Sequence, residues 1–311
     1  MKTGRVRGVV GLVACALVTC LALAATTVRA AEDAASLPRL MSPDDLARAI
    51  ERSDIQLCIV DMRESVADYW KGHIPGSVYL SVDTLTCPDG GVPAMLAPGR
   101  ALVAVLGRMG ISRRTHVVVY GSAGDYRHAY LLWALDHLGH DALSVLDGGF
   151  DAWERAGLPL TQDYPSVELT RYEPLFRSTT LCRVDLDQVK ALLDDEASVL
   201  VDARPGMMYA GLAGAWKRLG HIPGAVNRYW ADDLTADGLF RDPEVLRDEY
   251  SSLGVTPDKY VIVSCGVGMM SAHTYFTLKY VLGYPNVANY DGGFNEWSNV
   301  DELPVEAGGG Q

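Results

Sequence analysis

One duplication in the sequence constrains the fold more than any other feature. Four short segments of the first half recur in the second half in the same order, displaced by 141 to 148 residues. The matched pairs are Val60-Asp61-Met62-Arg63 with Val201-Asp202-Ala203-Arg204, Gly-His-Ile-Pro-Gly at residues 72–76 and 220–224, residues 109–112 with 253–256, and Asp-Gly-Gly-Phe at residues 147–150 and 291–294. Because the displacements differ only by loop-sized insertions, the pattern predicts two copies of one domain rather than an array of short repeats.

Each copy alternates predicted strands with predicted helices. Apolar, partly β-branched runs lie at residues 57–60, 117–119 and 143–146, and again at 199–201, 260–263 and 287–290. Such runs are typical of strands buried on both faces, which in an alternating pattern indicates a mainly parallel sheet flanked by helices. Ser42 and Pro43 mark a helix start. The predicted fold is therefore α/β, with domains at 38–162 and 181–305 joined by a proline-containing linker at 163–180.

The amino-terminal residues 1–30 have the features of a secretory signal peptide. A basic start at residues 2–7 precedes an apolar run, and small residues before Ala30 suit a signal peptidase. The apolar run is about 17 residues long and is interrupted by glycine and threonine, which is short for a transmembrane helix. We therefore expect export to the periplasm or the medium, with cleavage after Ala30 and no stable membrane insertion afterwards. A lipoprotein anchored through Cys15 is the minor alternative.

Charge excludes one class of partner. The chain carries 27 Lys and Arg against 39 Asp and Glu, a formal net charge of −12, and loss of the signal peptide would make it more acidic still. An acidic chain is poorly suited to binding the negatively charged phosphate backbone of a nucleic acid, so no nucleic-acid partner is expected.

Four cysteines follow the signal peptide: Cys58, Cys87, Cys182 and Cys265. They form no Cys-x-x-Cys pair and no Cys/His spacing suited to zinc, so we expect neither a thioredoxin-type motif nor a metal site. Cys58 lies in an apolar run and is interpreted as a small buried hydrophobe. Export implies an oxidising compartment, and the sequence leaves open whether Cys87 and Cys182 form a disulfide.

Cys265 is the candidate nucleophile. It follows the predicted strand 260–264 and opens the loop Cys265-Gly266-Val267-Gly268-Met269-Met270, after which a helix is expected over 272–282. The carboxyl ends of parallel strands are where α/β folds bind ligands. The two glycines let backbone N–H groups curl toward the sulfur, and the following helix directs its positive end there, both of which favour an anionic nucleophile. Alone, however, Cys265 would be interpreted as another buried core thiol.

The first copy provides an internal comparison for this loop. The aligned segment, residues 119–125, has Gly121 where the second copy has Cys265. One half therefore has the nucleophile and the other half lacks it.

These features together resemble the tandem rhodanese-domain sulfurtransferases, which include thiosulfate and 3-mercaptopyruvate sulfurtransferases. The resemblance covers roughly residues 38 to 305 and rests on the duplicated segments named above and on a cysteine in the second loop alone. It implies an inactive first domain and a catalytic second domain. It also implies that Cys265 takes sulfur from a small donor, holds it as a persulfide without a separate cofactor, and passes it to cyanide or a thiol. Residues 266–270 would then bind the persulfide.

Arg204 is the candidate for anion binding, because the family places a substrate-contacting arginine in this stretch. The structural alternative is an ion pair with Asp202, since Arg63 repeats the arrangement beside the inactive loop. Lys217 and Arg218 precede the second Gly-His-Ile-Pro-Gly segment and would either line the entrance or lie on the surface. For His73 and Asp61 the family suggests proton transfer, but His221 and Asp202 recur at the matched positions, which favours a structural role.

The loop sequence bears on the donor. Thiosulfate users of the family commonly have Cys-Arg-x-Gly-x-Thr/Arg and mercaptopyruvate users Cys-Gly-Ser-Gly-Val-Thr. Gly266 and Gly268 follow the second pattern, while Val267 and Met270 depart from it. A single arginine can bind the one carboxylate of mercaptopyruvate, so the sequence slightly favours that donor over dianionic thiosulfate.

Two other functions are associated with a cysteine at the end of a strand. Phosphatases of related architecture need an arginine six residues after the cysteine, and position 271 is serine. An exported sulfur carrier or binding module that uses the same cysteine without turnover is the remaining alternative, because the loop has no charged side chain.

Overall fold

A computed structural model of the chain describes residues 37–175 and 182–309. The first half contains β1 (Leu40–Met41), α2 (Pro43–Ile50), β2 (Leu57–Asp61), α3 (Val66–Lys71), β3 (Ser77–Tyr79), η1 (Val82–Leu85), β4 (Thr86–Asp89), β5 (Val92–Leu96), α4 (Gly99–Arg108), β6 (His116–Tyr120), α5 (Arg127–His137), β7 (Leu143–Leu146) and α6 (Gly149–Arg155). The second half contains β8 (Arg183–Val184), α7 (Leu186–Leu192), β9 (Ser198–Asp202), α8 (Gly206–Tyr209), β10 (Val226–Asn227), η2 (Trp230–Asp233), α9 (Pro243–Ser252), β11 (Tyr260–Ser264), α10 (Met269–Phe276), η3 (Thr277–Val281), β12 (Val287–Tyr290) and α11 (Gly293–Asn299).

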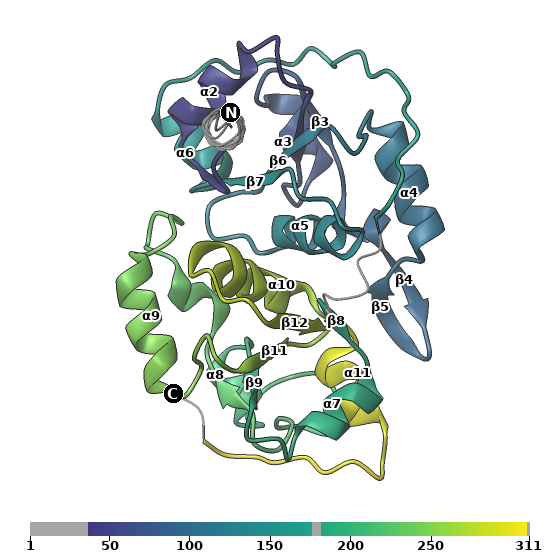
Figure 1. Ribbon diagram of the computed structural model, residues 1–311, viewed down its shortest axis with the longest axis vertical. Coiled ribbons are helices and arrows are strands. Elements are labelled where there is room, and N and C mark those ends of the chain that lie inside the picture. The colour runs from purple at the N-terminus through teal and green to yellow at the C-terminus, as the bar shows by residue number, and fades with distance from the viewer. Residues whose placement is uncertain (1–36, 176–181, 310–311) are drawn as a thin grey trace, which may run out of the picture. The chain divides into compact units, whose positions relative to one another are not determined.

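Each half has its own five-stranded sheet (Figure 1). The strand orders are β1-β7-β6-β2-β3 and β10-β9-β11-β12-β8, which are the same order when the duplicated strands are matched. All pairings in both sheets are parallel. The central strands are buried because helices pack against the sheets, as their apolar sequences predict. The prediction of two tandem α/β domains with parallel sheets is confirmed.

Local sequence signals agree with the observed helix ends. Ser42 caps α2, accepting a hydrogen bond from the backbone N–H of Asp45, whose side chain accepts in return from the N–H of Ser42. The helix expected over 272–282 begins three residues earlier, at Met269, and its last turn is a π-helix, η3. The earlier start matters for function, because it brings the helix amino terminus directly to the Cys265 loop.

The connection between the halves follows the surface of the first half. Residues 163–175 contain no helix or strand. The backbone N–H of Thr170 donates to Gly107 O (2.9 Å), and the N–H of Leu175 donates to Leu138 O (2.9 Å). Tyr172 is buried between these anchor points. Residues 163–175 of the linker are therefore held along α4 and the end of α5 by backbone hydrogen bonds and one buried aromatic side chain.

The halves meet through two helices that have long runs of buried residues. In α5, residues 128–135 are all buried, and in α10 residues 271–276 are all buried. The helix α5 packs on β6 and β7, α10 packs on β11 and β12, and the two helices pack against each other (Figure 1). A helix segment that is buried all round needs packing partners on every side. Here each helix has its own sheet on one side and the other helix on the opposite side.

Hydrogen bonds across this contact repeat with the duplication. The backbone N–H of Leu96 donates to Asp291 Oδ2 (2.7 Å), and the N–H of Phe240 donates to Asp147 Oδ1 (2.9 Å). Leu96 and Phe240 stand at matched positions of the two copies, as do Asp147 and Asp291. Each half therefore offers the same aspartate and the same backbone group to the other, as in a twofold-related dimer.

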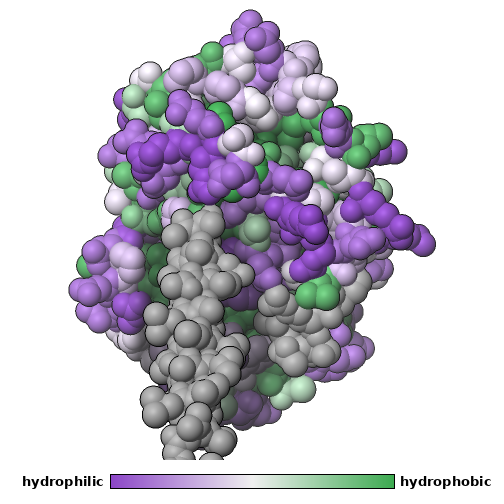
Figure 2. Space-filling model, turned by 45° about the horizontal axis from the view of Figure 1, so that its top comes forward, coloured by the Kyte–Doolittle hydropathy of each residue, from purple (hydrophilic) through white to green (hydrophobic). Residues whose placement is uncertain are grey.

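The surface is mostly hydrophilic on the face shown in Figure 2, where hydrophobic residues form small separate groups. Within the described ranges, no helix has the length and apolarity needed to cross a membrane. The predicted signal peptide and Cys15 lie outside the described residues.

The four cysteines of the described segments are all free thiols, so the structure shows no Cys87–Cys182 disulfide. Cys58 is a buried residue of β2, and burial raises the pKa of its thiol to about 12. The interpretation of Cys58 as a core residue agrees with this placement.

Candidate active site

Cys265 lies at the carboxyl end of β11 and is 2% exposed. Three residues separate it from α10, and the last of them, Gly268, adopts a left-handed conformation with φ 76°. A Cβ atom at this position would lie 2.7 Å from Asp291 Oδ1. Glycine is therefore required both by the backbone turn and by the close approach of Asp291.

The loop carbonyls are fixed by the next helix. The N–H groups of Phe294 and Asn295, in the first turn of α11, donate to the carbonyls of Cys265 (2.7 Å) and Gly266 (3.0 Å). Since a trans peptide directs its N–H opposite to its carbonyl, the N–H groups of Gly266 and Val267 point away from α11. Their expected contact with the sulfur stays a prediction.

The sulfur atom itself has a hydrogen-bond partner that the sequence analysis did not assign. Ser271 Oγ lies 3.4 Å from Cys265 Sγ and 2.7 Å from Asn289 Oδ1. Asn289 Nδ2 donates to the carbonyl of Gly268 (2.9 Å). A buried serine and asparagine therefore connect the sulfur to the turn that begins α10.

Aromatic and apolar side chains surround Cys265. Trp230 is buried against it, and Tyr126, Tyr229 and Met270 are half-buried members of the same cluster. Tyr126 comes from the first half, at the start of α5, and its ring lies 5.1 Å from that of Trp230 in an edge-on contact. Burial raises the pKa of Tyr126, with a contribution from Cys265. The inactive half thus supplies part of the surroundings of the active cysteine.

In the corresponding loop of the first half, a side chain lies close to the space that a cysteine would occupy. A Cβ atom on Gly121 would lie 3.0 Å from His128 Nδ1. His128 is buried, and burial lowers its pKa. The loop keeps its anchor, since the N–H of Phe150 donates to Gly121 O (2.9 Å) as Phe294 does to Cys265. The loop shape is therefore retained while a histidine side chain approaches the position of the missing sulfur.

Arg204 is buried and bound to its own strand. Its Nε and Nη2 donate to Asp202, with Nη2 2.5 Å from Oδ2, and Nη2 also donates to Gly220 O (2.8 Å). The guanidinium carbon lies 4.2 Å from the ring centre of Phe294 and 4.8 Å from that of Trp216. Nη1 is buried without a hydrogen-bond partner in the described part of the chain. These contacts correspond to the structural alternative, and the anion-binding role of Arg204 stays a prediction.

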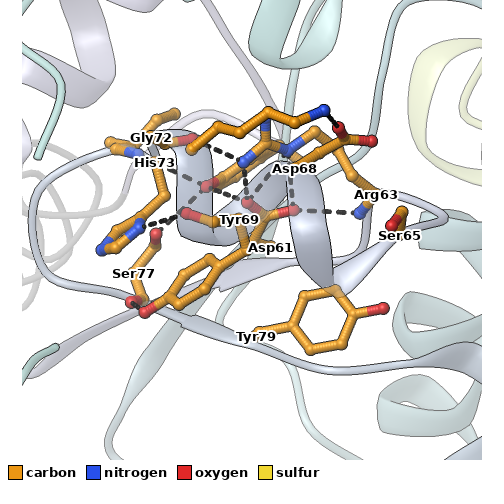
Figure 3. A network of polar contacts seen from close by, with 12 residues as sticks. Asp61, Arg63, Ser65, Asp68, Tyr69, Gly72, His73, Ser77 and Tyr79 are labelled. Atoms are coloured by element: carbon orange, nitrogen blue, oxygen red, sulfur yellow. Dashed lines mark hydrogen bonds and ion pairs between the residues drawn. The ribbon is translucent and has the colours of Figure 1, made fainter. Parts of the chain in front are cut away.

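Figure 3 shows the matching network of the first half. Arg63 pairs with Asp61 (2.6 Å between Nη2 and Oδ2), donates to Gly72 O (2.8 Å) and stacks on Phe150 at 3.8 Å. This network has the same contacts as that of Arg204, although the loop beside it has no cysteine. The shared geometry therefore fits a structural role in supporting the loop rather than a role in catalysis.

Asp61 and His73 belong to the same network. Asp61 also accepts a hydrogen bond from Tyr120 Oη (2.7 Å). His73 stacks on Tyr69 at 3.7 Å and lies within hydrogen-bond distance of the carbonyls of Tyr69 (2.9 Å) and Asp163 (3.2 Å). His221 stacks on Tyr209 at 3.6 Å in the same way. The structure does not bring Asp61 or His73 to Cys265.

Lys217 and Arg218 also lie away from the sulfur. Lys217 pairs with Asp301 at the surface (2.5 Å). Arg218 donates to the carbonyls of Trp297 (3.1 Å) and Val300 (2.6 Å) near the end of α11, where a cation is favoured. In this inserted segment Trp216 is the residue next to the loop, since a Cβ on Gly266 would lie 3.1 Å from its ring.

The sequence analysis missed five residues of the site: Tyr126, Trp216, Trp230, Ser271 and Asn289. Asn289 was the one with a usable signal, because it is a polar residue inside the apolar run 287–290. A buried polar side chain in a strand needs a partner, which points to a nearby hydrogen-bond network.

Comparison with known proteins agrees with this arrangement. Residues 42–156 and 185–300 each match the rhodanese-like domain. The chain belongs to the rhodanese family. This rhodanese is 34% identical over 270 residues to a thiosulfate sulfurtransferase of Corynebacterium glutamicum, covering 81% of this chain and 85% of the relative. It is also 34% identical over 280 residues to the sulfur carrier protein TtuD of Thermus thermophilus, covering 86% and 96% of the two chains.

Among solved structures, this rhodanese is similar to EanB, in a form described as a cysteine persulfide in a tetrahedral intermediate state with ergothioneine. The TM-score is 0.78 at 25% identity, covering 87% of this chain and 71% of the other. Together with the domain matches and the relatives, this supports a sulfurtransferase of the rhodanese family that acts on a small-molecule sulfur donor and acceptor.

Proposed function

We propose that this rhodanese transfers a sulfane sulfur from thiosulfate or 3-mercaptopyruvate to cyanide or a thiol through a persulfide on Cys265. The observation that carries the proposal is the contrast between the two loops. In both loops a phenylalanine N–H anchors the carbonyl of the first loop residue, but only the second loop has a sulfur at the strand end, beside the amino terminus of α10. In the first, His128 approaches the corresponding position.

The proposed reaction has two displacement steps. The Cys265 thiolate attacks the donor's transferable sulfur, so that a new S–S bond forms and the bond from that sulfur to the rest of the donor breaks (S–S in thiosulfate, C–S in mercaptopyruvate). With thiosulfate, sulfite leaves with the electron pair. With mercaptopyruvate, pyruvate leaves and the donor's thiol proton passes to its carbon. The acceptor anion then attacks the outer sulfur of the persulfide, which regenerates the Cys265 thiolate and yields thiocyanate or an acceptor persulfide.

The surroundings of Cys265 favour the donor with less charge. Residues 266–270 of the loop have no charged side chain. The hydrophobic side chains that pack with Cys265 in the described structure are Ala203, Trp230, Tyr126, Tyr229, Ala231, Leu234 and Met270. Moving a dianion from water into such surroundings costs more than moving a monoanion. We therefore propose that mercaptopyruvate is used in preference to thiosulfate, although the similar protein of Corynebacterium glutamicum is a thiosulfate sulfurtransferase.

The donor preference is tested by measuring kcat/KM for both donors side by side, with cyanide and with a thiol acceptor. We expect mercaptopyruvate to be preferred by about tenfold, which corresponds to about 1.4 kcal/mol in the transition state. The matched variant is Met270→Arg, which adds a cation beside Cys265 and should move the ratio toward thiosulfate. A clear preference of the unchanged protein for thiosulfate would contradict the proposal.

A sulfur carrier without turnover is the second candidate, and the similarity to a sulfur carrier protein over 280 residues favours it. The two functions differ in one measurable respect. A carrier should take up one sulfur per Cys265 and release it to a partner protein, with no steady-state turnover on cyanide or small thiols. Steady turnover with either donor would exclude the carrier.

We also propose that the protein is exported and cleaved after Ala30, on the basis of the basic, apolar and small-residue segments that precede it. Amino-terminal sequencing of the mature protein from its native host should begin at Ala31. A mature chain beginning at an acylated Cys15 would instead establish a lipoprotein.

A further inference from the structure

Two buried polar side chains beside Cys265 have no role in the reaction as proposed above. Ser271 and Asn289 are both 0% exposed, and they lie on α10 and β12, which follow Cys265 in the chain. Burying polar groups next to an apolar cluster is unfavourable unless each finds a hydrogen-bond partner. Their partners therefore show what the pair does.

The orientation of the Asn289 amide is fixed by Gly268. The carbonyl of Gly268 can only accept, so the Asn289 atom 2.9 Å from it must be the NH₂ nitrogen. The amide oxygen Oδ1 consequently faces Ser271. Because Oδ1 can only accept, the Ser271 hydroxyl must donate its proton to Oδ1 across the 2.7 Å separation.

The hydroxyl of Ser271 has one proton and two acceptors within reach. While it donates to Asn289, it can receive a hydrogen bond from the Cys265 thiol across the 3.4 Å between Oγ and Sγ. Once the thiol proton is lost to solvent, the sulfur becomes an acceptor with a full negative charge. A hydrogen bond to a charged acceptor is stronger than one to a neutral amide. The hydroxyl proton should then turn from Asn289 to the sulfur.

We propose that Ser271 is a positioning residue that stabilises the anionic sulfur of Cys265. While the sulfur is neutral, Asn289 accepts the hydrogen bond from the Ser271 hydroxyl. The inference rests on the proposed function only in taking Cys265 as the reacting cysteine. Two opposite effects follow. Removing the Ser271 hydroxyl takes a donor from the anion, whereas removing the Asn289 oxygen frees that donor for the sulfur.

The test measures the alkylation rate of Cys265 by iodoacetamide across pH, followed on the Cys265 peptide by mass spectrometry. In Ser271→Ala, the pH at half-maximal rate should rise by about one unit, a tenfold lower anion fraction at a given pH below it. Thr274→Val is the matched control. Thr274 lies on the same helix, is 0% exposed, and has a hydroxyl without a hydrogen-bond partner in the described structure, so its removal should leave the midpoint unchanged.

The second variant, Asn289→Leu, separates positioning from packing. Positioning requires its midpoint to fall below that of the unchanged protein, opposite to Ser271→Ala. Equal midpoints in Ser271→Ala and the unchanged protein would overturn the proposal, and so would shifts of the two variants in the same direction. Alkylation needs no sulfur donor, so failure of the proposed sulfur transfer would show as lost turnover while the opposite midpoint shifts remained.

Discussion

Replacing Cys265 with serine is expected to abolish sulfur uptake and to lower donor turnover to background, by about ten-thousandfold or more, as loss of a catalytic nucleophile does. The unchanged protein, incubated with thiosulfate or mercaptopyruvate, should gain the mass of one sulfur atom. A serine hydroxyl at the same position cannot form a persulfide, and its oxygen is a poor nucleophile without an adjacent base. Intact-mass measurement of the protein after donor removal gives the result directly.

The matched control for this prediction is Cys87→Ser. Cys87 lies on β4, is more exposed than the other three cysteines of the described segments, and lies outside the Cys265 cluster. This variant should therefore take up sulfur as the unchanged protein does. Sulfur uptake that persists in Cys265→Ser and disappears in Cys87→Ser would assign the reaction to Cys87 in the first half. That result would reject the proposed function.

Replacing Arg204 with alanine is expected to lower the free energy of unfolding by about 3–5 kcal/mol, the usual cost of leaving one partner of a buried ion pair alone. Asp202 is 4% exposed and would lose the bidentate contact that now compensates its charge. The rings of Phe294 and Trp216 would also lose the guanidinium that lies between 4 and 5 Å from them. Urea unfolding followed by tryptophan fluorescence measures the loss.

Arg63→Ala is the internal control for Arg204→Ala. Arg63 makes the same contacts to Asp61, Gly72 and Phe150 beside the loop that has no cysteine, so its loss should destabilise the chain to a similar extent. A loss for Arg204→Ala much smaller than for Arg63→Ala would contradict a supporting role. Donor kinetics of the two variants at low temperature test the other role predicted from the sequence. A KM for the donor that rises in Arg204→Ala but not in Arg63→Ala would show that the Arg204 guanidinium binds the donor.

The agreement between sequence and structure is closest where a signal is local. The strand runs, the capped start of α2 and the duplicated segments all fall where they were expected. Each depends on residues that are neighbours in the chain, because helix caps and buried strands are specified within a few positions. For the same reason, Cys265 could be placed at a strand end before a glycine-containing loop.

The contact between the halves could not be predicted in the same way. Residues 128–135 of α5 and 271–276 of α10 contain no Asp, Glu, Lys or Arg, which indicates that each helix is surrounded by other groups but not which groups these are. The pairing of Leu96 with Asp291, nearly two hundred residues apart, follows from how two complete sheets and their helices pack. This contact also brings Tyr126 of the first half into the cluster around Cys265.

The sequence by itself determined that the chain has two α/β domains, that they are copies of each other, and which of them has a cysteine at its loop. Tertiary structure alone decided what each charged or polar side chain does. The sequence made Arg204 the candidate for anion binding and left Lys217 either at the entrance or on the surface, because residue type fixes a charge but not the direction in which the side chain points. In the folded chain Asp202 binds Arg204 and Asp301 binds Lys217. Ser271, which contacts the sulfur, also meets Asn289, eighteen positions away, because α10 packs on β12.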